Sequence, residues 1–345
     1  MRDKQSELIP GGLGGGQGEL ALLNRIRQRA RGSAKDELRL GIGDDCAILR
    51  LKPGEELVVT TDLSIAERHF RLAWHAPESV GHRALARGLS DIAAMGARPL
   101  AAFLSLGLPK ELTRAHGRRR AWVDSFLDGF LALADQYQTP LAGGDLAQST
   151  VAVADVVLLG SVPRGKALLR SGVQAGDVVW VTGALGGAAA GLELLRKGSG
   201  RKFSNARSSD KGTGQLRAHL WPQPRIAQGI WLRQRGAATA AIDLSDGLST
   251  DLGHLCAESG ISAVIDATAL PIYDGAMLDQ ALHGGEDYEL LFTARPDTSI
   301  PRRIAGVSVS RIGEIIRRRA GQPYISLVGA SGRRPLRRGG WEHFS

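Results

Sequence analysis

Short hydrophobic runs alternate along this chain with longer stretches in which hydrophobic residues recur at helical spacing. Residues 55–61, 151–159 and 177–182 are predicted to be strands, and Asp155 is expected to interrupt the second of them. Residues 77–95 follow a helical pattern that has a proline in its first turn. The chain is therefore expected to alternate strand and helix.

The predicted helix at 77–95 combines an apolar face with one misplaced charge. Leu85, Leu89 and Ile92 share a face that can pack on a core. Asp91 lies in the last turn, where a negative charge opposes the helix dipole at a cost of ~0.3–1 kcal/mol. A carboxylate in this position either faces solvent or meets a cation.

Five short segments place acidic residues beside glycine or small hydroxyl residues. In such segments backbone and carboxylate oxygens can approach a hard cation or a metal-bound phosphate closely. One segment alone would be an ordinary turn. Five segments require a common explanation, and their presence favours a cation partner for Asp91 as well. The segments are Gly41–Asp45, Thr60–Asp62, Gly143–Asp145, Asp243–Gly247 and Gly284–Glu289.

Length and composition predict two domains. Single cores stop growing near ~250–300 residues, whereas this chain has 345, of which 43% are hydrophobic. Turn-forming residues at 161–165 indicate a connection between the domains. The predicted organisation is a flexible glycine-rich N-terminus at 1–18, a first domain at 19–162 that carries most of the acidic segments, and a C-terminal domain at 163–345 with a flexible insertion at 196–216.

The net charge of +9 is concentrated at the C-terminal end. Residues 301–345 contain ten arginines against Glu314 and Glu342, so the rest of the chain is nearly neutral. This arginine-rich end lacks the interleaved aromatic residues that stack on nucleic-acid bases. We therefore expect a solvated basic surface and no nucleic-acid partner, with RNA or acidic lipid as the alternative.

Cysteine usage and hydropathy point to the cytoplasm. Cys46 and Cys256 belong to no paired-cysteine motif, so neither a disulfide framework nor a zinc site is predicted. No apolar run approaches the ~18 residues that span a bilayer, and the N-terminus has no signal-peptide pattern. We expect a cytoplasmic protein with no membrane contact.

The usual lysine-based and glycine-based nucleotide motifs are missing. Residues 183–191 have the glycines of a phosphate loop but no Gly-Lys-Ser/Thr. The segment at 41–45 lacks the third glycine of a dinucleotide fingerprint, and Asp44 and Asp45 would repel a pyrophosphate unless a metal intervened. Many carboxylates without such a lysine favour phosphate binding through several Mg²⁺ ions. Phosphoryl transfer is the predicted chemistry, and metal-assisted hydrolysis remains open.

Seven motifs then follow one another in an order that argues against chance. They are Gly41–Ala47, Thr60–Asp62 with His69–Phe70 downstream, Leu89–Gly96, Gly143–Asp145, Leu168–Gly172, Ile242–Leu248 and Gly284–Leu290. This series resembles the thiamine-monophosphate kinase family, and the resemblance runs from about residue 19 to residue 344.

The resemblance implies both a fold and an activity. The implied fold is a two-domain α/β (α+β) fold like that of aminoimidazole ribonucleotide synthetase. Its N-terminal mixed-sheet domain would pair in a homodimer, and an α/β domain would follow. The implied activity uses ATP and Mg²⁺ to convert thiamine monophosphate into thiamine diphosphate.

The resemblance also implies roles for individual residues. The implied Mg²⁺ ligands are Asp45, Thr60, Thr61, Asp62, Asp91, Asp145, Asp243 and Asp246, among which Asp62, Asp91, Asp145 and Asp243 are expected to be catalytic. The implied ATP contacts are Gly144, Asp145, Arg170 and Ser245. The implied contacts of thiamine monophosphate are His69, Glu286 and Trp341. An aromatic face attracts the cationic thiazolium ring by ~0.5–2 kcal/mol, which suits a tryptophan.

No catalytic base is needed for this reaction. The nucleophile is a phosphate oxygen whose second pKa is about 6, so it is largely deprotonated at neutral pH. The obstacle is repulsion between two anions, which positioning and charge neutralisation overcome. We expect direct in-line transfer without a phosphoenzyme. One departure from the family is that Leu146 and Ala147 follow Asp145, where the family usually has threonine.

Three alternatives remain at this stage. A sister enzyme, such as selenophosphate synthetase or aminoimidazole ribonucleotide synthetase, would share the metal chemistry but use another acceptor. A non-catalytic RNA-binding protein would use the arginine-rich end. A magnesium-dependent phosphatase would release phosphate into water.

Overall fold

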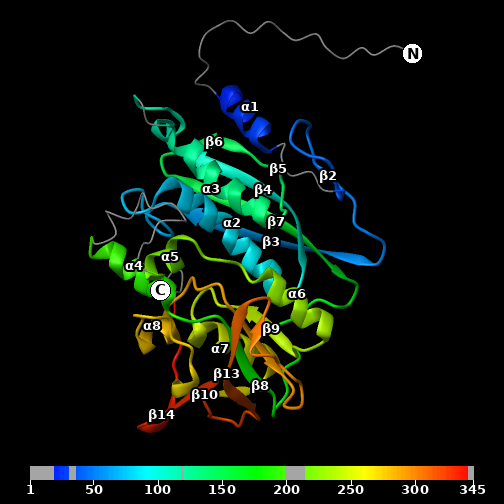
Figure 1. Cartoon of the computed structure of the whole chain (residues 1–345), viewed down its shortest axis with the longest axis vertical. Coiled ribbons are helices and arrows are strands. Elements are labelled where there is room, and N and C mark those ends of the chain that lie inside the picture. The colour runs from blue at the N-terminus through cyan, green and yellow to red at the C-terminus, as the bar shows by residue number, and fades with distance from the viewer. Residues whose placement is uncertain (1–18, 31–35, 118–119, 199–213, 341–345) are drawn as a thin grey trace, which may run out of the picture.

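A five-stranded mixed sheet forms the framework of the N-terminal half (Figure 1). Its strands are β3 (Glu55–Ile65), β4 (Arg98–Leu108), β5 (Leu141–Gly143), β6 (Leu146–Gln148) and β7 (Val153–Pro163). The structure is a computed structural model that describes residues 19–30, 36–117, 120–198 and 214–340. The strand order is β3-β7-β4-β5, with β6 also paired to β4. β7 is antiparallel to β3 and β4, whereas β5 and β6 run parallel to β4.

Two helices, α2 (Pro77–Ala94) and α3 (Trp122–Gln136), pack on one face of this sheet (Figure 1). The predicted apolar face of α2 is confirmed, because Leu85, Leu89 and Ile92 are fully buried. Proline occupies the first turn, and Gly96 follows the helix with a φ of 64°, a backbone conformation that glycine adopts without strain.

The two helices cross at backbone contact. A Cβ added to Gly81 would lie 1.9 Å from the carbonyl oxygen of Phe126, and one added to Gly129 would lie 1.8 Å from that of Glu78. No side chain fits at either position, so the two glycines fix the distance between the helices.

The opposite face of the sheet remains open along β3. Successive side chains of a strand point to opposite faces. Leu57, Val59 and Leu63 accordingly share one face and are 48%, 53% and 46% exposed. We refer to Leu57, Val59 and Leu63 together as the open apolar face.

An eight-stranded sheet forms the framework of the C-terminal half. Its strands are β8 (Val178–Thr182), β9 (Ala240–Asp243), β10 (Ser262–Asp266), β11 (Leu290–Ala294), β12 (Arg303–Ile304), β13 (Val307–Ile316), β14 (Ile325–Gly329) and β15 (Gly332–Pro335). The order is β15-β14-β10-β13-β8-β11-β9, with β12 beside β13. All these pairs are antiparallel except β10 with β14.

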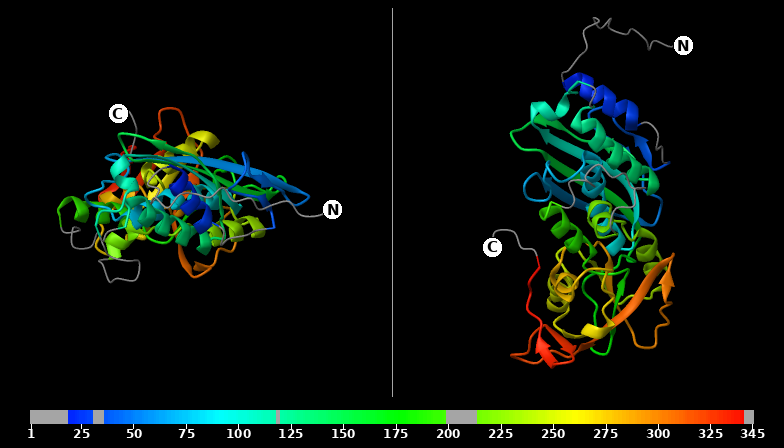
Figure 2. Two further views of the ribbon diagram at one scale, coloured as in Figure 1. Left: turned by 90° about the horizontal axis from the view of Figure 1, so that it is seen from above. Right: turned by 60° about the vertical axis from the view of Figure 1, so that its left-hand side comes forward.

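The remaining elements surround the two sheets (Figures 1 and 2). The helices are α1 (Glu19–Ala30), α4 (Gly187–Arg196), α5 (Gly214–Leu220), α6 (Ile226–Arg235), α7 (Leu248–Ser259) and α8 (Leu278–His283). The two short strands β1 (Leu38–Leu40) and β2 (Ile48–Leu49) pair with each other. The combination of two sheets with packed helices confirms the predicted α/β (α+β) class.

The N-terminal helix α2 packs directly on the C-terminal half. A Cβ at Gly229 of α6 would lie 1.9 Å from the carbonyl oxygen of Ala93, so these helices also meet at their backbones. Arg233 donates from Nε to the carbonyl oxygen of Gly96 at 2.7 Å. Helix α2 therefore contacts both the first sheet and the C-terminal half.

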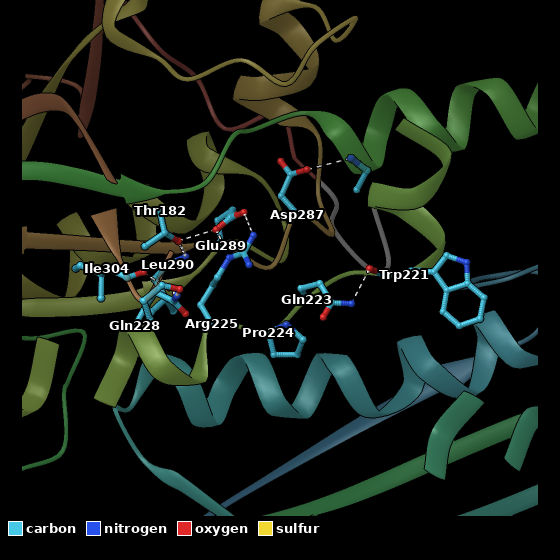
Figure 3. Close-up of polar contacts among 12 residues, drawn as sticks. Thr182, Trp221, Gln223, Pro224, Arg225, Gln228, Asp287, Glu289, Leu290 and Ile304 are labelled. Atoms are coloured by element: carbon cyan, nitrogen blue, oxygen red, sulfur yellow. Dashed lines mark hydrogen bonds and ion pairs between the residues drawn. The ribbon is translucent and has the colours of Figure 1, made fainter. Parts of the chain in front are cut away.

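An ion pair between the half-buried Arg225 and the buried Glu289 stabilises the segment that leads into α6 (Figure 3). Arg225 donates from Nε to Glu289 Oε2 at 2.6 Å, and Thr182 donates to the same oxygen at 2.6 Å. Gln228 donates to the carbonyl oxygen of Ile304 at 3.0 Å. These bonds join α6, β8 and the residue before β11.

Several predicted elements differ in detail from those observed. The strand predicted at 55–61 continues to Ile65. The expected interruption at Asp155 is wrong, because β7 pairs with β3 without a break through that residue. Residues 214–216 of the predicted insertion begin α5, while 1–18 and 199–213 lie outside the described residues. Within the described ranges, no helix combines the length and apolar character needed to cross a membrane.

Candidate functional site

A cleft of about 560 Å³ lies where the two halves meet. Helix α2 and strand β3 line it from one side, and the loops after β9 and before β11 line it from the other. Residues 339–340, near the end of the described chain, also line it. Its predicted site residues are Asp62, His69, Asp91, Asp243, Ser245, Asp246 and Glu286.

Strand alternation decides which residues of β3 reach this cleft. Thr60 and Asp62 point toward α2, where Thr60 Oγ1 donates to Asp91 Oδ2 at 2.5 Å and Asp62 Oδ1 lies 3.4 Å from Arg87 Nε. Thr61 lies between them in the sequence, so its exposed side chain points to the opposite face. The structure therefore brings Thr60, Asp62 and Asp91 together and leaves the hydroxyl of Thr61 outside.

Helix α2 connects this group to the C-terminal half. Ser90, which is fully buried, donates from Oγ to Asp243 Oδ2 at 2.7 Å. Its neighbour Asp91 accepts the bond from Thr60. The last turn of α2 thus brings together Asp91 of the N-terminal half and Asp243 of the C-terminal half. Asp91, whose charge opposes the dipole of its own helix, lines the cleft.

Two loops of the C-terminal half run side by side along the cleft. The amide of Glu286 donates to the carbonyl oxygen of Ser245 at 2.8 Å. The amide of Tyr288 likewise donates to the carbonyl oxygen of Leu244 at 2.9 Å. The amide of Asp246 donates to the carboxylate of the buried Asp251 at 3.1 Å. These bonds fix Ser245, Asp246 and Glu286 relative to one another.

Burial and the charges of neighbouring carboxylates raise the pKa values of several acidic side chains in and beside the cleft. Burial raises the pKa of Asp62 to about 6; Arg87 opposes the rise, and Asp91 adds to it. Burial, and then the charge of Asp91, raises the pKa of Asp243 to about 7. Burial and the neighbouring Asp243 raise the pKa of Asp251 to about 8. A bound cation would relieve this crowding of carboxylates.

The donor set suits a magnesium ion that also binds substrate. Carboxylate and hydroxyl oxygens are the ligands that Mg²⁺ prefers. Among the described residues, no three His, Cys, Asp or Glu side chains converge on one point that could hold a metal. An ion here would be held by one or two carboxylates together with phosphate oxygens and water, which is the usual binding mode of Mg²⁺.

Asp45 and Asp145 lie in a different cavity. This cavity, of about 840 Å³, is lined by residues 41–47, by helix α1 and by residues around Gly144 and Asp145. Asp62 pairs with Val156, Val156 pairs with Leu104, and Leu104 accepts a bond from the amide of Asp145. Strands lie about 4.8 Å apart, so this path crosses three spacings, or about 14 Å. The structure does not place Asp45 and Asp145 beside Asp62 and Asp91.

Gly144 is restricted to glycine by its surroundings. Its φ is 147°, and a Cβ there would lie 1.9 Å from the carbonyl oxygen of Leu104. Asp145, next to it, accepts a bond from the amide of Leu146, the residue that departs from the family pattern. The chain therefore passes close to the backbone of β4 at this point, which only glycine allows.

The remaining predicted residues are distributed as follows. Arg170 is exposed, and its charge partly offsets the burial that raises the pKa of Asp91 and of Asp243. His69 lines the cleft and accepts a bond at Nδ1 from the amide of Ile65 at 3.0 Å. Trp341 lies outside the described residues.

Comparison with known proteins identifies the family. Residues 43–163 match the N-terminal domain, and residues 174–325 the C-terminal domain, of the family described as AIR synthase related protein. Thiamine-monophosphate kinase from Salmonella typhimurium is 38% identical over 304 residues, which cover 86% of this chain and 87% of that protein. The chain belongs to the thiamine-monophosphate kinase family.

Solved structures of the thiamine-monophosphate kinase family agree with the fold. The enzyme from Stenotrophomonas maltophilia has a TM-score of 0.74 at 37% identity, covering 90% of this chain and 96% of that one. A structure described as AaThiL complexed with AMPPCP and TMP has a TM-score of 0.72 at 29% identity, covering 95% and 97%. The predicted family and the predicted two-part fold are therefore confirmed.

In this member of the thiamine-monophosphate kinase family, three residues around the cleft were missed from the sequence, namely Arg83, Arg87 and Asp251. Arg83, Arg87 and Asp91 are spaced four residues apart, which places them along one side of α2. This regular spacing of charged residues within a helix that also has an apolar face could have been recognised from the sequence. Asp251 gave no such signal, because its role depends on the bond from Asp246 within a folded loop.

Proposed function

We propose that the protein transfers the γ-phosphate of ATP to thiamine monophosphate and so makes thiamine diphosphate. Its similarity to thiamine-monophosphate kinases over most of both chains carries this proposal. The relative described as complexed with AMPPCP and TMP supports the choice of substrates. The acidic cleft between the two halves supplies a place for phosphate chemistry.

The donor side of the cleft would hold the triphosphate. Asp62, Asp91, Asp243 and Asp246 would hold Mg²⁺ ions, each ion through one or two of these carboxylates, and the bound ions would supply positive charge against the phosphate oxygens. Ser245 offers a hydroxyl at the same edge, and Arg170 offers a positive charge near Asp91 and Asp243. Asp45, Gly144 and Asp145 would contact the nucleotide or a further ion from the second cavity.

The acceptor side would bind thiamine monophosphate. His69 and Glu286 line the cleft, and both bond to Arg83, which precedes Asp91 by about two turns of α2. We assign Trp341 to the same side by family resemblance. Glu286 can accept a hydrogen bond from the substrate or balance the cationic thiazolium ring. The donor and acceptor would therefore meet between the aspartates and Glu286.

Arg87 lies where the two anionic substrates would meet. It lines the cleft, pairs with Asp62 and acts electrostatically on Glu286. The acceptor phosphate is already largely deprotonated at neutral pH, so no side chain has to remove a proton. Neutralising charge and aligning the reacting oxygens are the remaining tasks, and both suit direct in-line transfer.

We also propose a homodimer that covers the open apolar face of β3. The exposed side chains of Leu57, Val59 and Leu63 form an apolar strip on one strand, in which Thr61 is the one polar position. Such strips on soluble proteins mark interaction surfaces. A second copy of the chain can satisfy the same strip symmetrically.

A turnover assay tests the proposed function. Purified protein is incubated with ATP, Mg²⁺ and thiamine monophosphate, and both ADP and thiamine diphosphate are measured by chromatography. We expect equal amounts of the two products and none without Mg²⁺. ADP without thiamine diphosphate would overturn the proposal and favour a hydrolase or another acceptor.

A further inference from the structure

Arg83 lies behind the cleft and bonds to both of its described acceptor-side residues. It belongs to α2 and is only 5% exposed. Its Nη2 donates to Glu286 Oε1 at 2.5 Å and to the carbonyl oxygen of His69 at 3.3 Å. One buried guanidinium thus connects two residues that come from opposite halves of the molecule.

Two buried histidines continue this network. Arg83 Nη1 lies 2.9 Å from His219 Nε2, and His75 Nε2 lies 3.0 Å from the same nitrogen. A guanidinium can only donate, so His219 Nε2 must accept. His75 can then only share the single lone pair of His219 as a second donor from its own Nε2, which leaves His75 Nδ1 to accept from the amide of Arg71 at 3.1 Å.

The tautomer of His219 follows from these bonds. Since its Nε2 accepts, its proton is on Nδ1, which lies 3.6 Å from Glu286 Oε2. Burial, and then the charge of Arg83, lowers the pKa of His75 to about 3 and the pKa of His219 well below its usual value. Both histidines are neutral at physiological pH, so Arg83 carries the one positive charge of this group and faces the carboxylate of Glu286.

Glu286 has a conformation that needs such support. Its φ of 68° is in the left-handed region, which a glutamate rarely adopts unless its surroundings hold it there. Its side chain is 26% exposed and lines the cleft, whereas Arg83 and His219 are at most 6% exposed behind it. One side of the carboxylate is therefore fixed by the protein, and the rest is available to a ligand.

We propose that Arg83, backed by neutral His219 and His75, is a positioning residue for the acceptor. It holds the carboxylate of Glu286 and the backbone of His69 at the spacing that thiamine monophosphate requires. Because its charge already balances Glu286, that carboxylate acts mainly as a hydrogen-bond acceptor toward the substrate. This inference rests on the proposed function, since it concerns the acceptor side of the same cleft.

Steady-state kinetics of Arg83 variants test the inference. Loss of a hydrogen bond to a charged group corresponds to about a 10- to 100-fold change in affinity. We therefore expect Arg83→Met to raise KM for thiamine monophosphate by about that factor and to leave KM for ATP within about twofold. Arg83→Lys keeps the charge without the fork and should give a smaller increase.

Two further variants keep the inference testable if Arg83→Met does not fold. His219→Gln retains an acceptor for Arg83 and should raise KM for thiamine monophosphate only modestly. Arg225→Lys weakens a comparable buried pair with Glu289 outside the cleft lining, so it should lower Tm without changing either KM. Circular dichroism checks that each variant is folded.

The outcomes separate this inference from the proposed function. If wild-type protein makes no thiamine diphosphate, the proposed function fails and the inference fails with it. If wild-type protein is active but folded Arg83→Met and Arg83→Lys keep a normal KM for thiamine monophosphate, only the positioning role is overturned. Equal increases in both KM values would likewise contradict it and point to a general loss of structure.

Discussion

At the residue scale, the site consists of carboxylates that the fold brings too close together for an unliganded protein. Asp62 and Asp91 come from the N-terminal half and Asp243 from the C-terminal half, yet Asp91 contributes to the raised pKa of both Asp62 and Asp243. Bonds from Thr60 and Ser90 hold two of these side chains in place. This crowding makes activity and stability sensitive to single charge changes.

Asp91→Asn should inactivate the protein without unfolding it. The change removes the charge that acts on both Asp62 and Asp243, and loss of one preorganised electrostatic group costs about 10²–10³ in kcat. The Tm without Mg²⁺ should stay the same or rise, because repulsion falls. Kinetics and thermal melts check both outcomes, with the exposed Asp297→Asn as the matched control. Normal kcat in Asp91→Asn would contradict the assigned role.

The raised pKa values of Asp62 and Asp243 predict a pH-dependent stability. In the folded protein these groups hold protons up to about pH 6 and 7, whereas in the unfolded chain they lose them near pH 4. The folded state binds more protons in this window, so the free energy of unfolding without Mg²⁺ should fall as the pH rises from about 4 to 7.

Thermal melts at low and high pH measure this effect. Adding Mg²⁺ with ATP should raise Tm more at pH 8, where these carboxylates are ionised, than at pH 5, where they are partly protonated. An equal rise at both values would show that the buried carboxylates do not take part in binding.

At the element scale, helix α2 connects the parts of the site. It carries Arg83, Arg87, Ser90 and Asp91, and it packs on α3, on β3 and on α6. The sequence predicted this helix and its buried face correctly because helical periodicity is a local signal. Its partners were not predictable in that way, since Arg83 and His219 are 136 residues apart.

The same contrast holds for the strands. The sequence placed β3 and β7 close to their observed positions, and strand alternation would have separated Thr61 from Thr60 and Asp62. Family resemblance grouped all three as ligands. The separation of Asp145 from Asp62 depends on the order β3-β7-β4-β5, which no local pattern encodes.

Substituting the glycine at the α2–α3 crossing should destabilise the protein. Gly129→Ala inserts a methyl group where the backbone of Glu78 lies 1.8 Å away, and such overpacking costs about 1–3 kcal/mol. Gly88→Ala is the matched control, because its Cβ would meet Leu158 at an ordinary 3.4 Å and alanine favours the helix. Urea unfolding compares them; equal stability of the two variants would show that the crossing tolerates a side chain.

At the scale of the whole molecule, the first sheet has helices on one face and exposed apolar side chains on the other. The site lies where that sheet's helix α2 meets the C-terminal half. Dimer formation through the exposed face would leave this cleft accessible to substrates, because Thr61 and its neighbours on the open face point away from Asp62 and Asp91.

Charges on the open apolar face should prevent dimer formation. Val59→Lys places a charge at the centre of the strip formed by Leu57, Val59 and Leu63, where pairing two copies would bury both lysines. Light scattering after size-exclusion chromatography should show a dimer for wild type and a monomer for the variant. Met277→Glu alters another exposed hydrophobic residue and should remain dimeric. A monomeric wild-type protein would contradict the proposed interface.

The fate of a radiolabelled γ-phosphate of ATP tests the central claim most directly. With Mg²⁺ and thiamine monophosphate present, the account predicts that the label appears in thiamine diphosphate, and that Asp91→Asn slows this transfer by about 10²–10³-fold. Label found only in inorganic phosphate would contradict it, because the cleft would then pass the phosphoryl group to water.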